Sequence, residues 1–470
     1  MTKRSIVVLM MVVLVTACKV GPNYKKPQVQ APTVYRGVAD PAAQPDPQTL
    51  ADTKWFDVFN DDRLRELIRA ALIGNYDLRE AVARVNQARA SYGITRSDQF
   101  PTIFASAEIE TDRRSRTGSV ELPEPLKQQR TFGTVLLNLL TFEVDIWGRL
   151  RRATESAKAD LLASEETRKA VITTLVSDVA AAYFNLRELD YELEISKRTL
   201  VSRQESLRII NLRQQRGVSN MLEVRQAEQL VYSATEVIPA LEQSIEQQEN
   251  FLSFLLGKNP APVDRGRGLT EQQMPPSVPP GLPSDLIGRR PDIRAAEQGL
   301  ISANALIGVA KAAYFPQITL TGALGYQSTA LNSLFTKPSG VWSFIPSVTQ
   351  PIFTAGRIKS NVRFTEAQRE LFLVQYERAI QNAFREVSDS LIAYRKVKEV
   401  RTQRELLVTT LTDRTRLAYM RYTGGVSNLL EALDADRNQF DAELSLAQSR
   451  RDELLTVVQL YKALGGGWQQ

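Results

Sequence analysis

A four-residue sequence that occurs twice constrains the fold more than any other feature of this chain. Gly217-Val218-Ser219-Asn220 returns 208 positions later as Gly425-Val426-Ser427-Asn428. Glycine often ends a helix in the left-handed conformation, and a serine or asparagine just after it can cap the next helix. Each copy lies between two long helical patterns. Each copy is therefore predicted to be the tip of a helical hairpin.

The repeat extends upstream of the two tips. Gly148-Arg149-Leu150 matches Gly356-Arg357-Ile358 at the same offset of 208, whereas Phe100-Pro101 matches Phe315-Pro316 at an offset of 215. Seven extra residues in the first copy must therefore lie between about 107 and 145. Insertions are tolerated in exposed loops, so a surface loop is expected there. The chain is one module used twice.

Each copy contains two stretches in which apolar and polar residues alternate, within about 102–144 and within about 317–353. Alternation over about ten residues is typical of strands, either in a membrane-spanning barrel or in an ordinary sandwich. Alternation alone does not separate these two. Four strands are too few to close a barrel, since about eight is the smallest known number. If these strands cross a membrane, the chain must be oligomeric.

The helical patterns are long, and they divide the chain into segments. A first helix is expected from near Asp61 to about Ser97, and no proline or glycine interrupts Leu150 to Leu212. After the first tip, apolar residues keep heptad spacing from Val224 to Leu255, which indicates a coiled coil. The predicted segments are a signal peptide (1–17), an extended N-terminal arm (18–60), a first repeat (61–256), a Pro-rich linker (257–287) and a second repeat (288–470).

The N-terminus has the pattern of an export signal. Lys3 and Arg4 precede an apolar run that is too short to span a membrane. The run ends in Val15-Thr16-Ala17-Cys18, which resembles the lipobox of bacterial lipoproteins, whose cysteine is acylated. Lys19, rather than an aspartate, follows the cysteine, and for such lipoproteins this resembles outer-membrane sorting. Cys18 is therefore the expected lipid attachment site, and the alternative is an ordinary buried cysteine in an uncleaved segment.

Composition excludes several classes of function. The chain has no histidine and a single cysteine, which removes Ser-His and Cys-His catalysis and His/Cys metal sites. The net charge is +6, but lysines and arginines are scattered beside acidic residues without a basic cluster. Nucleic-acid binding is therefore not expected. We expect no enzymatic activity, no catalytic residues, no metal and no cofactor other than the covalent lipid on Cys18.

Several local motifs together resemble a known family. The chain is similar to TolC-type outer-membrane factors, in the OprM-like (NodT-type) lipoprotein branch of resistance-nodulation-division efflux systems. The matching motifs cover nearly the whole chain and are Cys18-Lys19-Val20-Gly21-Pro22-Asn23-Tyr24 with Pro27, Trp55 with Phe59, Asp61 and Leu64, Asp145 to Arg152, Gly281 to Ser284 with Arg289 to Ile293, and Tyr461 to Trp468.

The resemblance implies a mainly helical α+β fold in a homotrimer. Three chains would each contribute four strands to a twelve-stranded outer-membrane β-barrel, continued by a long α-helical coiled-coil barrel in the periplasm. The protein would be lipid-anchored in the bacterial outer membrane. It would pass small toxic compounds passively to the exterior from a proton-driven inner-membrane pump and a periplasmic adaptor. The alternatives are a duct for secreted polypeptides and a structural coiled-coil lipoprotein without a pore.

Two groups of residues are candidates for function. The tips, Gly217, Val218, Ser219, Gly425, Val426 and Ser427, are expected to contact the adaptor, although turn chemistry alone also requires glycine. Leu430, Asp434 and Arg437 follow the second tip on one helix face, where the first copy has Leu222, Gln226 and Gln229. By the resemblance, the leucine and aspartate constrict a periplasmic aperture on the threefold axis.

A ring of three Asp434 side chains predicts a preference for cations, offset in part by Arg437. The alternative for the charged pair is a solvated helix face with an ordinary ion pair.

Overall fold

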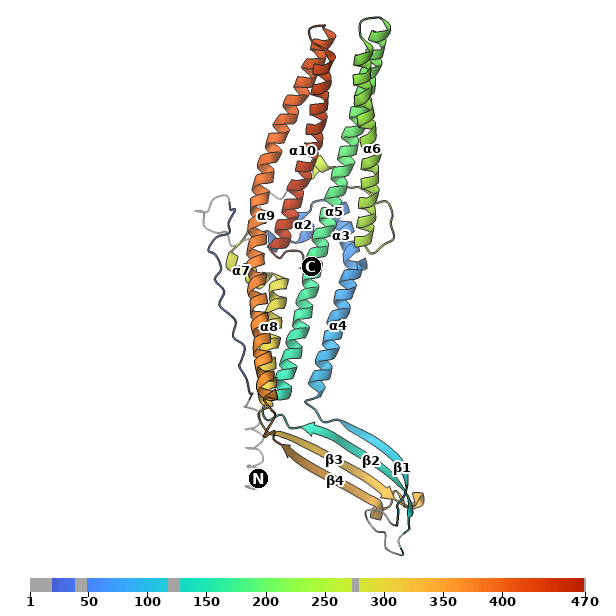
Figure 1. The fold of residues 1–470 in the computed structure, drawn as a ribbon, viewed down its shortest axis with the longest axis vertical. Helices are drawn as coiled ribbons and strands as arrows, with labels where there is room; N and C mark the ends of the chain where they lie inside the picture. The colour runs from blue at the N-terminus through green and yellow to red at the C-terminus, as the bar shows by residue number, and fades with distance from the viewer. Residues whose placement is uncertain (1–18, 39–48, 117–124, 126, 273–278, 469–470) are drawn as a thin grey trace. The chain divides into compact units, whose positions relative to one another are not determined.

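The computed structural model describes residues 19–38, 49–116, 125, 127–272 and 279–468. The expected signal peptide (1–17) and the expected lipid attachment site Cys18 lie outside the described residues. The order of elements is repeated, because in each half a helix, two strands and a long helical hairpin follow one another (Figure 1).

The first half contains the short helices η1 (Leu50–Asp52) and α2 (Trp55–Val58), then α3 (Asp62–Gly74), α4 (Tyr76–Ser97), β1 (Ile103–Arg113), β2 (Gln129–Glu143), α5 (Arg149–Gln215) and α6 (Met221–Leu255). The second half contains η2 (Leu269–Glu271), α7 (Pro283–Arg289), α8 (Pro291–Ala312), β3 (Gln317–Ser328), η3 (Leu331–Ser333), η4 (Lys337–Ser339), β4 (Gly340–Thr349), α9 (Arg357–Thr423) and α10 (Leu429–Ala463).

The helical hairpins repeat residue for residue. α5 and α9 each have 67 residues, and α6 and α10 each have 35. At 1.5 Å per residue, the longer helices extend about 100 Å. All four helices begin and end at positions 208 apart, which confirms the offset in the sequence. The predicted seam of α6 is buried from Val224 to Leu255, apart from a few half-buried positions.

All four strands form one antiparallel sheet, in the order β1-β2-β3-β4. β1 pairs with β2 from Ile103↔Leu139 to Arg113↔Gln129, and β3 pairs with β4 from Gln317↔Thr349 to Tyr326↔Gly340. The two predicted hairpins are also joined to each other, because β2 pairs with β3 through a bulge between Leu139 and Phe142. The sheet has two outer edges, β1 and β4.

The extra residues of the first copy are divided between a strand and a loop. β2 has 15 residues whereas β4 has 10. The connection between β1 and β2 is residues 114–128, and the one between β3 and β4 is residues 329–339. Part of the first connection, 117–124 and 126, lies outside the described residues.

The single helix expected from Asp61 to Ser97 is instead two helices that meet at Asn75. Asn75 is extended, with φ −61° and ψ 134°. Its side-chain amide donates to the Leu255 carbonyl at 3.0 Å, and its side-chain oxygen accepts from the Leu78 N–H at 2.9 Å. A tertiary contact with the end of α6 therefore breaks the helix, and the same side chain caps α4.

Asp61 connects α3, α5 and the segment that follows α6. Its carboxylate caps α3 by accepting from the Arg63 N–H at 2.9 Å and the Leu64 N–H at 3.3 Å. It also accepts from the Tyr183 hydroxyl at 2.9 Å, the Arg267 N–H at 3.0 Å and the Gln272 side-chain amide at 2.9 Å. The side chain is buried, so these donors replace the water that the carboxylate loses.

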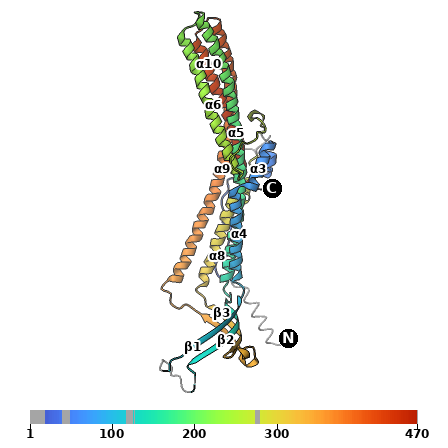
Figure 2. The same ribbon diagram turned by 90° about the vertical axis from the view of Figure 1, so that its right-hand side faces the viewer.

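The chain divides into two compact units, and each is built from both repeats. Unit 1 holds the described residues up to Pro27 with Val85–Ala163 and Ala296–Tyr376, which include the sheet. Unit 2 holds the described residues of Gln28–Arg84, Ser164–Ala295 and Glu377–Gln470, which include both hairpin tips. Within unit 2, the two hairpins lie side by side with their tips at one end (Figures 1 and 2). No described helix is both long and apolar enough to cross a membrane.

Candidate functional site at the tips of the helical hairpins

Both tips close with the same backbone geometry. Gly217 has φ 73° and Gly425 has φ 75°, the left-handed region that favours glycine. The Val218 N–H donates to the Arg213 carbonyl at 2.9 Å, and the Val426 N–H donates to the Arg421 carbonyl at 3.0 Å. A Cβ added at either glycine would meet no atom within 4 Å. Backbone conformation, not lack of space, therefore requires glycine at both tips.

Asparagine side chains start the returning helices. The Asn220 side-chain oxygen accepts from the Glu223 N–H, and the Asn428 oxygen accepts from the Glu431 N–H, both at 3.0 Å. Between glycine and asparagine, the valines point outward, with Val218 65% and Val426 71% exposed. Each tip thus presents an apolar side chain to solvent on a fixed turn.

The two tips are connected to each other. The Tyr422 hydroxyl, on the second hairpin, donates to the Glu223 carboxylate of the first at 3.3 Å. The Arg213 guanidinium lies 4.8 Å from the centre of the Tyr422 ring, a cation–π contact. Both hairpins also contribute to one buried cluster, made of Ile210, Val224, Ala227, Ala418, Tyr422, Leu429, Ala432, Leu433 and Ala435. The tips therefore form one surface within the chain.

The predicted aperture residues lie together on α10, and a residue of α9 joins them. The Asp434 carboxylate accepts from Arg437 at 2.9 Å, as the spacing predicts. It also accepts from Arg414 of α9 at 2.8 Å and from the Asn438 side chain at 3.0 Å. Leu430 is 58% exposed on the same helix. One carboxylate thus faces two guanidiniums, which gives this cluster a net positive charge and argues against the cation preference expected from Asp434 alone.

This polar cluster belongs to one hairpin. The positions 208 residues earlier than Arg414, Asp434, Arg437 and Asn438 hold Ser206, Gln226, Gln229 and Leu230. The first hairpin therefore has no charge at any of these four positions. A natural control is thus available within the same chain.

The start of the N-terminal arm is held in unit 1 by one buried arginine. The Arg152 guanidinium donates to the Val20 carbonyl at 3.2 Å, the Gly21 carbonyl at 3.3 Å and the Asn23 side chain at 2.8 Å. Gly21 has φ 95°, and a Cβ there would lie 2.5 Å from the Gly308 Cα. The arm is therefore held from Val20 to Asn23, close to the expected lipid attachment site.

A family model for outer membrane efflux proteins matches residues 67–258 and 282–466, which correspond to the two repeats. The chain belongs to the outer membrane efflux protein family. It is 38% identical over 461 residues to the solvent efflux pump outer membrane protein SrpC of Pseudomonas putida, covering 96% of both chains. It is 33% identical over 459 residues to the cation efflux system protein CusC of Escherichia coli O6:H1, covering 97% of both.

A solved structure has the same fold. The open state of the MtrE outer membrane channel of Neisseria gonorrhoeae superposes with a TM-score of 0.87 at 33% identity, covering 96% of this chain and 99% of that one. The likeness therefore extends over the strands and both hairpins. These matches confirm the family, the mainly helical fold and the outer-membrane location expected from the sequence.

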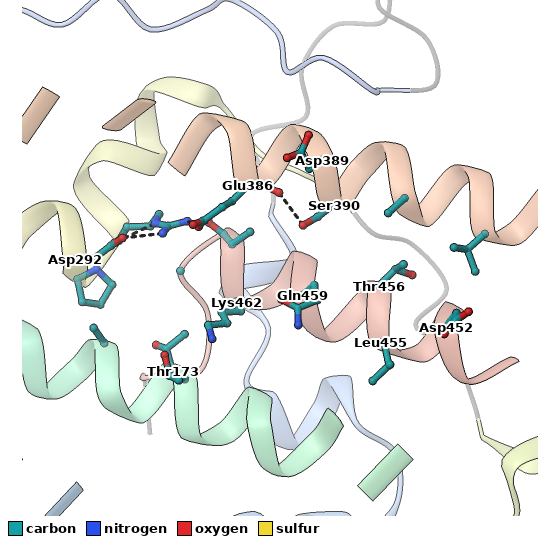
Figure 3. A pocket seen from close by; sticks show the side chains of 18 residues that line it. Thr173, Asp292, Glu386, Asp389, Ser390, Asp452, Leu455, Thr456, Gln459 and Lys462 are labelled. Carbon is teal, nitrogen blue, oxygen red and sulfur yellow. Dashed lines mark hydrogen bonds and ion pairs between the residues drawn. The ribbon is translucent and has the colours of Figure 1, made fainter. Parts of the chain in front are cut away.

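The efflux protein also has a recess of about 720 Å³ in unit 2, between α5, α9, α10 and the start of α8 (Figure 3). The buried Arg290 donates to Asp292 and Glu386, each at 2.7 Å, and to the Ala463 carbonyl at 2.9 Å. Burial lowers the pKa of Arg290, but hydrogen bonds to Asp292 and the charges of both carboxylates outweigh it and raise the pKa above its ordinary value. Arg290 of the Arg289–Ile293 motif thus joins the end of α10 to α8 and α9.

The sequence predicted the positions of the two hairpin tips and the Asp434–Arg437 pair, but it did not indicate Arg414. It lies 20 positions before Asp434 on the other arm of the hairpin, so its only signal was an antiparallel register about the tip. Among the residues that the structure describes, no three histidine, cysteine, aspartate or glutamate side chains are placed to hold a metal ion.

Proposed function

We propose that this outer membrane efflux protein is the passive exit duct of a three-part efflux pump and works as a homotrimer. The sheet carries this proposal, because its two faces differ. One face is apolar although its side chains are more than half exposed, as at Ile103, Ile109, Leu137, Leu324, Trp342, Phe344 and Val348. The other face is more polar, with Ser106, Glu108, Asn138, Thr321 and Ser343 among apolar residues such as Phe104, Leu136 and Ile345. An apolar outer face and a polar inner face are what a membrane barrel requires.

Closure of the sheet supports three copies. The outer edges of β1 and β4 have no partner strand among the described residues of one chain. Unpaired edges in lipid leave backbone groups without hydrogen bonds, so the edges must be paired. β1 of one copy against β4 of the next closes a barrel once enough strands are present, and three copies supply twelve.

The tips are the proposed contact with a periplasmic adaptor, which in turn links the duct to a proton-driven inner-membrane pump. Val218 and Val426 protrude on rigid turns, and Met221, Leu222, Met420 and Leu430 expose further apolar surface beside them. Exposed apolar groups on a preformed surface are typical of protein contacts. We assign no catalytic role, no metal and no cofactor beyond a lipid on Cys18.

Small toxic compounds are the proposed cargo. The relatives named above act in solvent and cation efflux pumps. Their alignment covers nearly all of both chains, which favours efflux over export of polypeptides. A lumen that conducts ions would also distinguish a duct from a coiled-coil lipoprotein without a pore. Single-channel recording of purified trimers in planar bilayers tests this directly. If trimers do not conduct even when the aperture is opened by the Asp434→Ala substitution, the protein is not a duct.

The aperture is proposed to be closed by Leu430 and by the contacts of Asp434 with Arg414 and Arg437. Asp434→Ala removes one carboxylate and leaves two guanidiniums, so bilayer recordings are expected to show larger conductance and ion selectivity shifted toward anions. Gln226→Ala, at the equivalent position of the first hairpin, is expected to change neither. Equal conductance and selectivity in the two variants would remove Asp434 from the aperture.

A further inference from the structure

α5 and α10 run antiparallel and meet along a ladder of polar contacts within unit 2. α5 belongs to the first hairpin and α10 to the second, so this seam joins the two hairpins. From the tail toward the tips, the contacts are Asp178–Lys462 at 4.0 Å, Glu188–Arg451 at 3.4 Å, Glu192–Gln448 at 3.0 Å, Arg198–Glu443 at 2.7 Å and Arg203–Asp436 at 2.7 Å.

The middle of the ladder differs from its ends. The other contacts pair opposite charges, whereas Glu188 and Glu192 lie one turn apart on the same face of α5, so that two carboxyl groups stand side by side. Both are buried, with 3% and 7% of their surfaces exposed. A carboxylate can only accept a hydrogen bond, so two buried carboxyl groups one turn apart can bond to each other only when one of them carries a proton.

Of the two α10 side chains that contact this pair in the ladder, one, Arg451, carries a positive charge. From α10, Arg451 contacts Glu188, but the same guanidinium also binds Asp452 at 2.8 Å, and Gln448 is neutral. On α5, the charge that acts on Glu188 is that of Glu192, which is negative. Three carboxyl groups therefore share one cation, and two buried carboxylates side by side repel each other strongly.

The titration of Glu188 agrees with this geometry. Burial, followed by the hydrogen bond that protonated Glu188 donates to the Glu192 carboxylate and by the charge of Glu192, raises the pKa of Glu188 from 4.5 to about 8. The closed seam therefore binds this proton more tightly than an opened, solvated seam does. Its extra stability is fully present below pH 4.5, falls as pH rises, and is gone above about pH 8.

The pair is placed where a small opening moves the tips. Glu192 lies 25 residues before Gly217, and Gln448 lies 20 residues after Asn428. At 1.5 Å per residue these are lever arms of about 38 and 30 Å. Of the ladder contacts named above, loss of the middle ones leaves Arg198–Glu443 and Arg203–Asp436 on the side of the tips and Asp178–Lys462 on the side of the tail.

We propose that Glu188 and Glu192 form a proton-dependent lock between the two hairpins. With a proton shared between the carboxyl groups, α5 is held against α10. When that proton leaves to solvent, the two carboxylates repel each other and the middle of the seam opens, while the buried cluster at the tips keeps the two hairpins joined there. The lock goes beyond the duct function, because it adds pH control of the arms that carry the tips.

Hydrogen–deuterium exchange of full-length trimers in detergent, from pH 6 to pH 9, tests the lock. Exchange in peptides covering 184–196 and 444–456 is corrected for the intrinsic pH dependence. While the closed seam holds one extra proton, the opening equilibrium rises about tenfold per pH unit. We expect at least a tenfold rise between pH 6 and pH 8 in the wild type, and none in Glu188→Gln. Glu194→Gln, exposed on the same helix, should keep the wild-type rise.

A second variant separates the lock from a general loss of stability. Arg451 lowers the pKa of Glu188, so Arg451→Met should move the rise to higher pH even if it weakens the seam. If the exchange of Arg451→Met rises at the same pH as in the wild type, or at a lower pH, the proposed lock is wrong. It is equally overturned if the wild type shows no rise, or if Glu188→Gln retains it.

Discussion

At the scale of single residues, the buried carboxylate of Asp61 stabilises unit 2 by accepting hydrogen bonds from three different segments of the chain. Burial raises the pKa of its carboxyl group, but hydrogen bonds from Gln272, Tyr183 and the backbone outweigh burial, and the pKa lies below the ordinary 3.8. The stabilisation by Asp61 is therefore fully present above about pH 3.8, the pKa of an ordinary aspartate, and is lost as the pH falls through the lower pKa of the folded protein. Asp61→Asn should lower the free energy of unfolding by about 2 kcal/mol at pH 7. Thermal unfolding followed by circular dichroism from pH 7 to pH 3 measures this, and the variant should lose part of the acid sensitivity.

The neighbouring residue supplies the control for this prediction. Asp62 is exposed and pairs with Arg65 in an ordinary helical ion pair. Asp62→Asn should change stability by less than about 0.5 kcal/mol. If the two variants unfold alike, the network around Asp61 is not what stabilises this region. Asp61 could be found in the sequence as part of a motif, but its stabilising role depends on contacts with distant residues, which the sequence spacing does not predict.

At the scale of elements, the tips test whether backbone shape or side-chain chemistry governs adaptor contact. Gly425→Val forces a β-branched residue into φ 75°, at a cost of about 1–2 kcal/mol or more, although the site has room for the side chain. Crosslinking to the adaptor should fall several-fold while trimer yield is unchanged. Gly93→Val, at a helical glycine that also has open space around it, should leave both unchanged. Unaltered crosslinking in Gly425→Val would remove this tip from the contact.

Elements with local causes were predictable from the sequence, and those with distant causes were not. Glycine and asparagine set the tips through their own backbone and side chains, so the tips were found. The break at Asn75 depends on the Leu255 carbonyl, the β2–β3 pairing joins strands about 190 positions apart, and Arg414 reaches Asp434 across a hairpin. Each of these contacts brings distant segments together, which periodicity along one helix or strand does not record.

At the scale of the whole molecule, the proposed trimer should not depend on its lipid. Cys18→Ser should abolish labelling with radioactive palmitate, because the acylated thiol is gone. Trimers should persist in outer-membrane fractions, because a closed sheet with an apolar face holds itself in the bilayer. Semi-native gel electrophoresis of membrane extracts measures this. Loss of all trimers would mean that the acyl chains, not the sheet, anchor the protein, and labelling that persists would exclude Cys18 as the site.

The N-terminal arm that Arg152 holds is synthesised long before some of the residues that contact it. The arm is made first, yet Asn304, which donates to the Pro22 carbonyl at 3.0 Å, is 282 positions away. At about 5–20 residues per second, the ribosome needs roughly 14 to 56 s to reach it. During that interval the arm lacks the hydrogen bond from Asn304. A chain that stops before α8 therefore keeps the Arg152 contacts of its N-terminal arm but lacks the one from Asn304, and unit 1 is completed only by the second repeat.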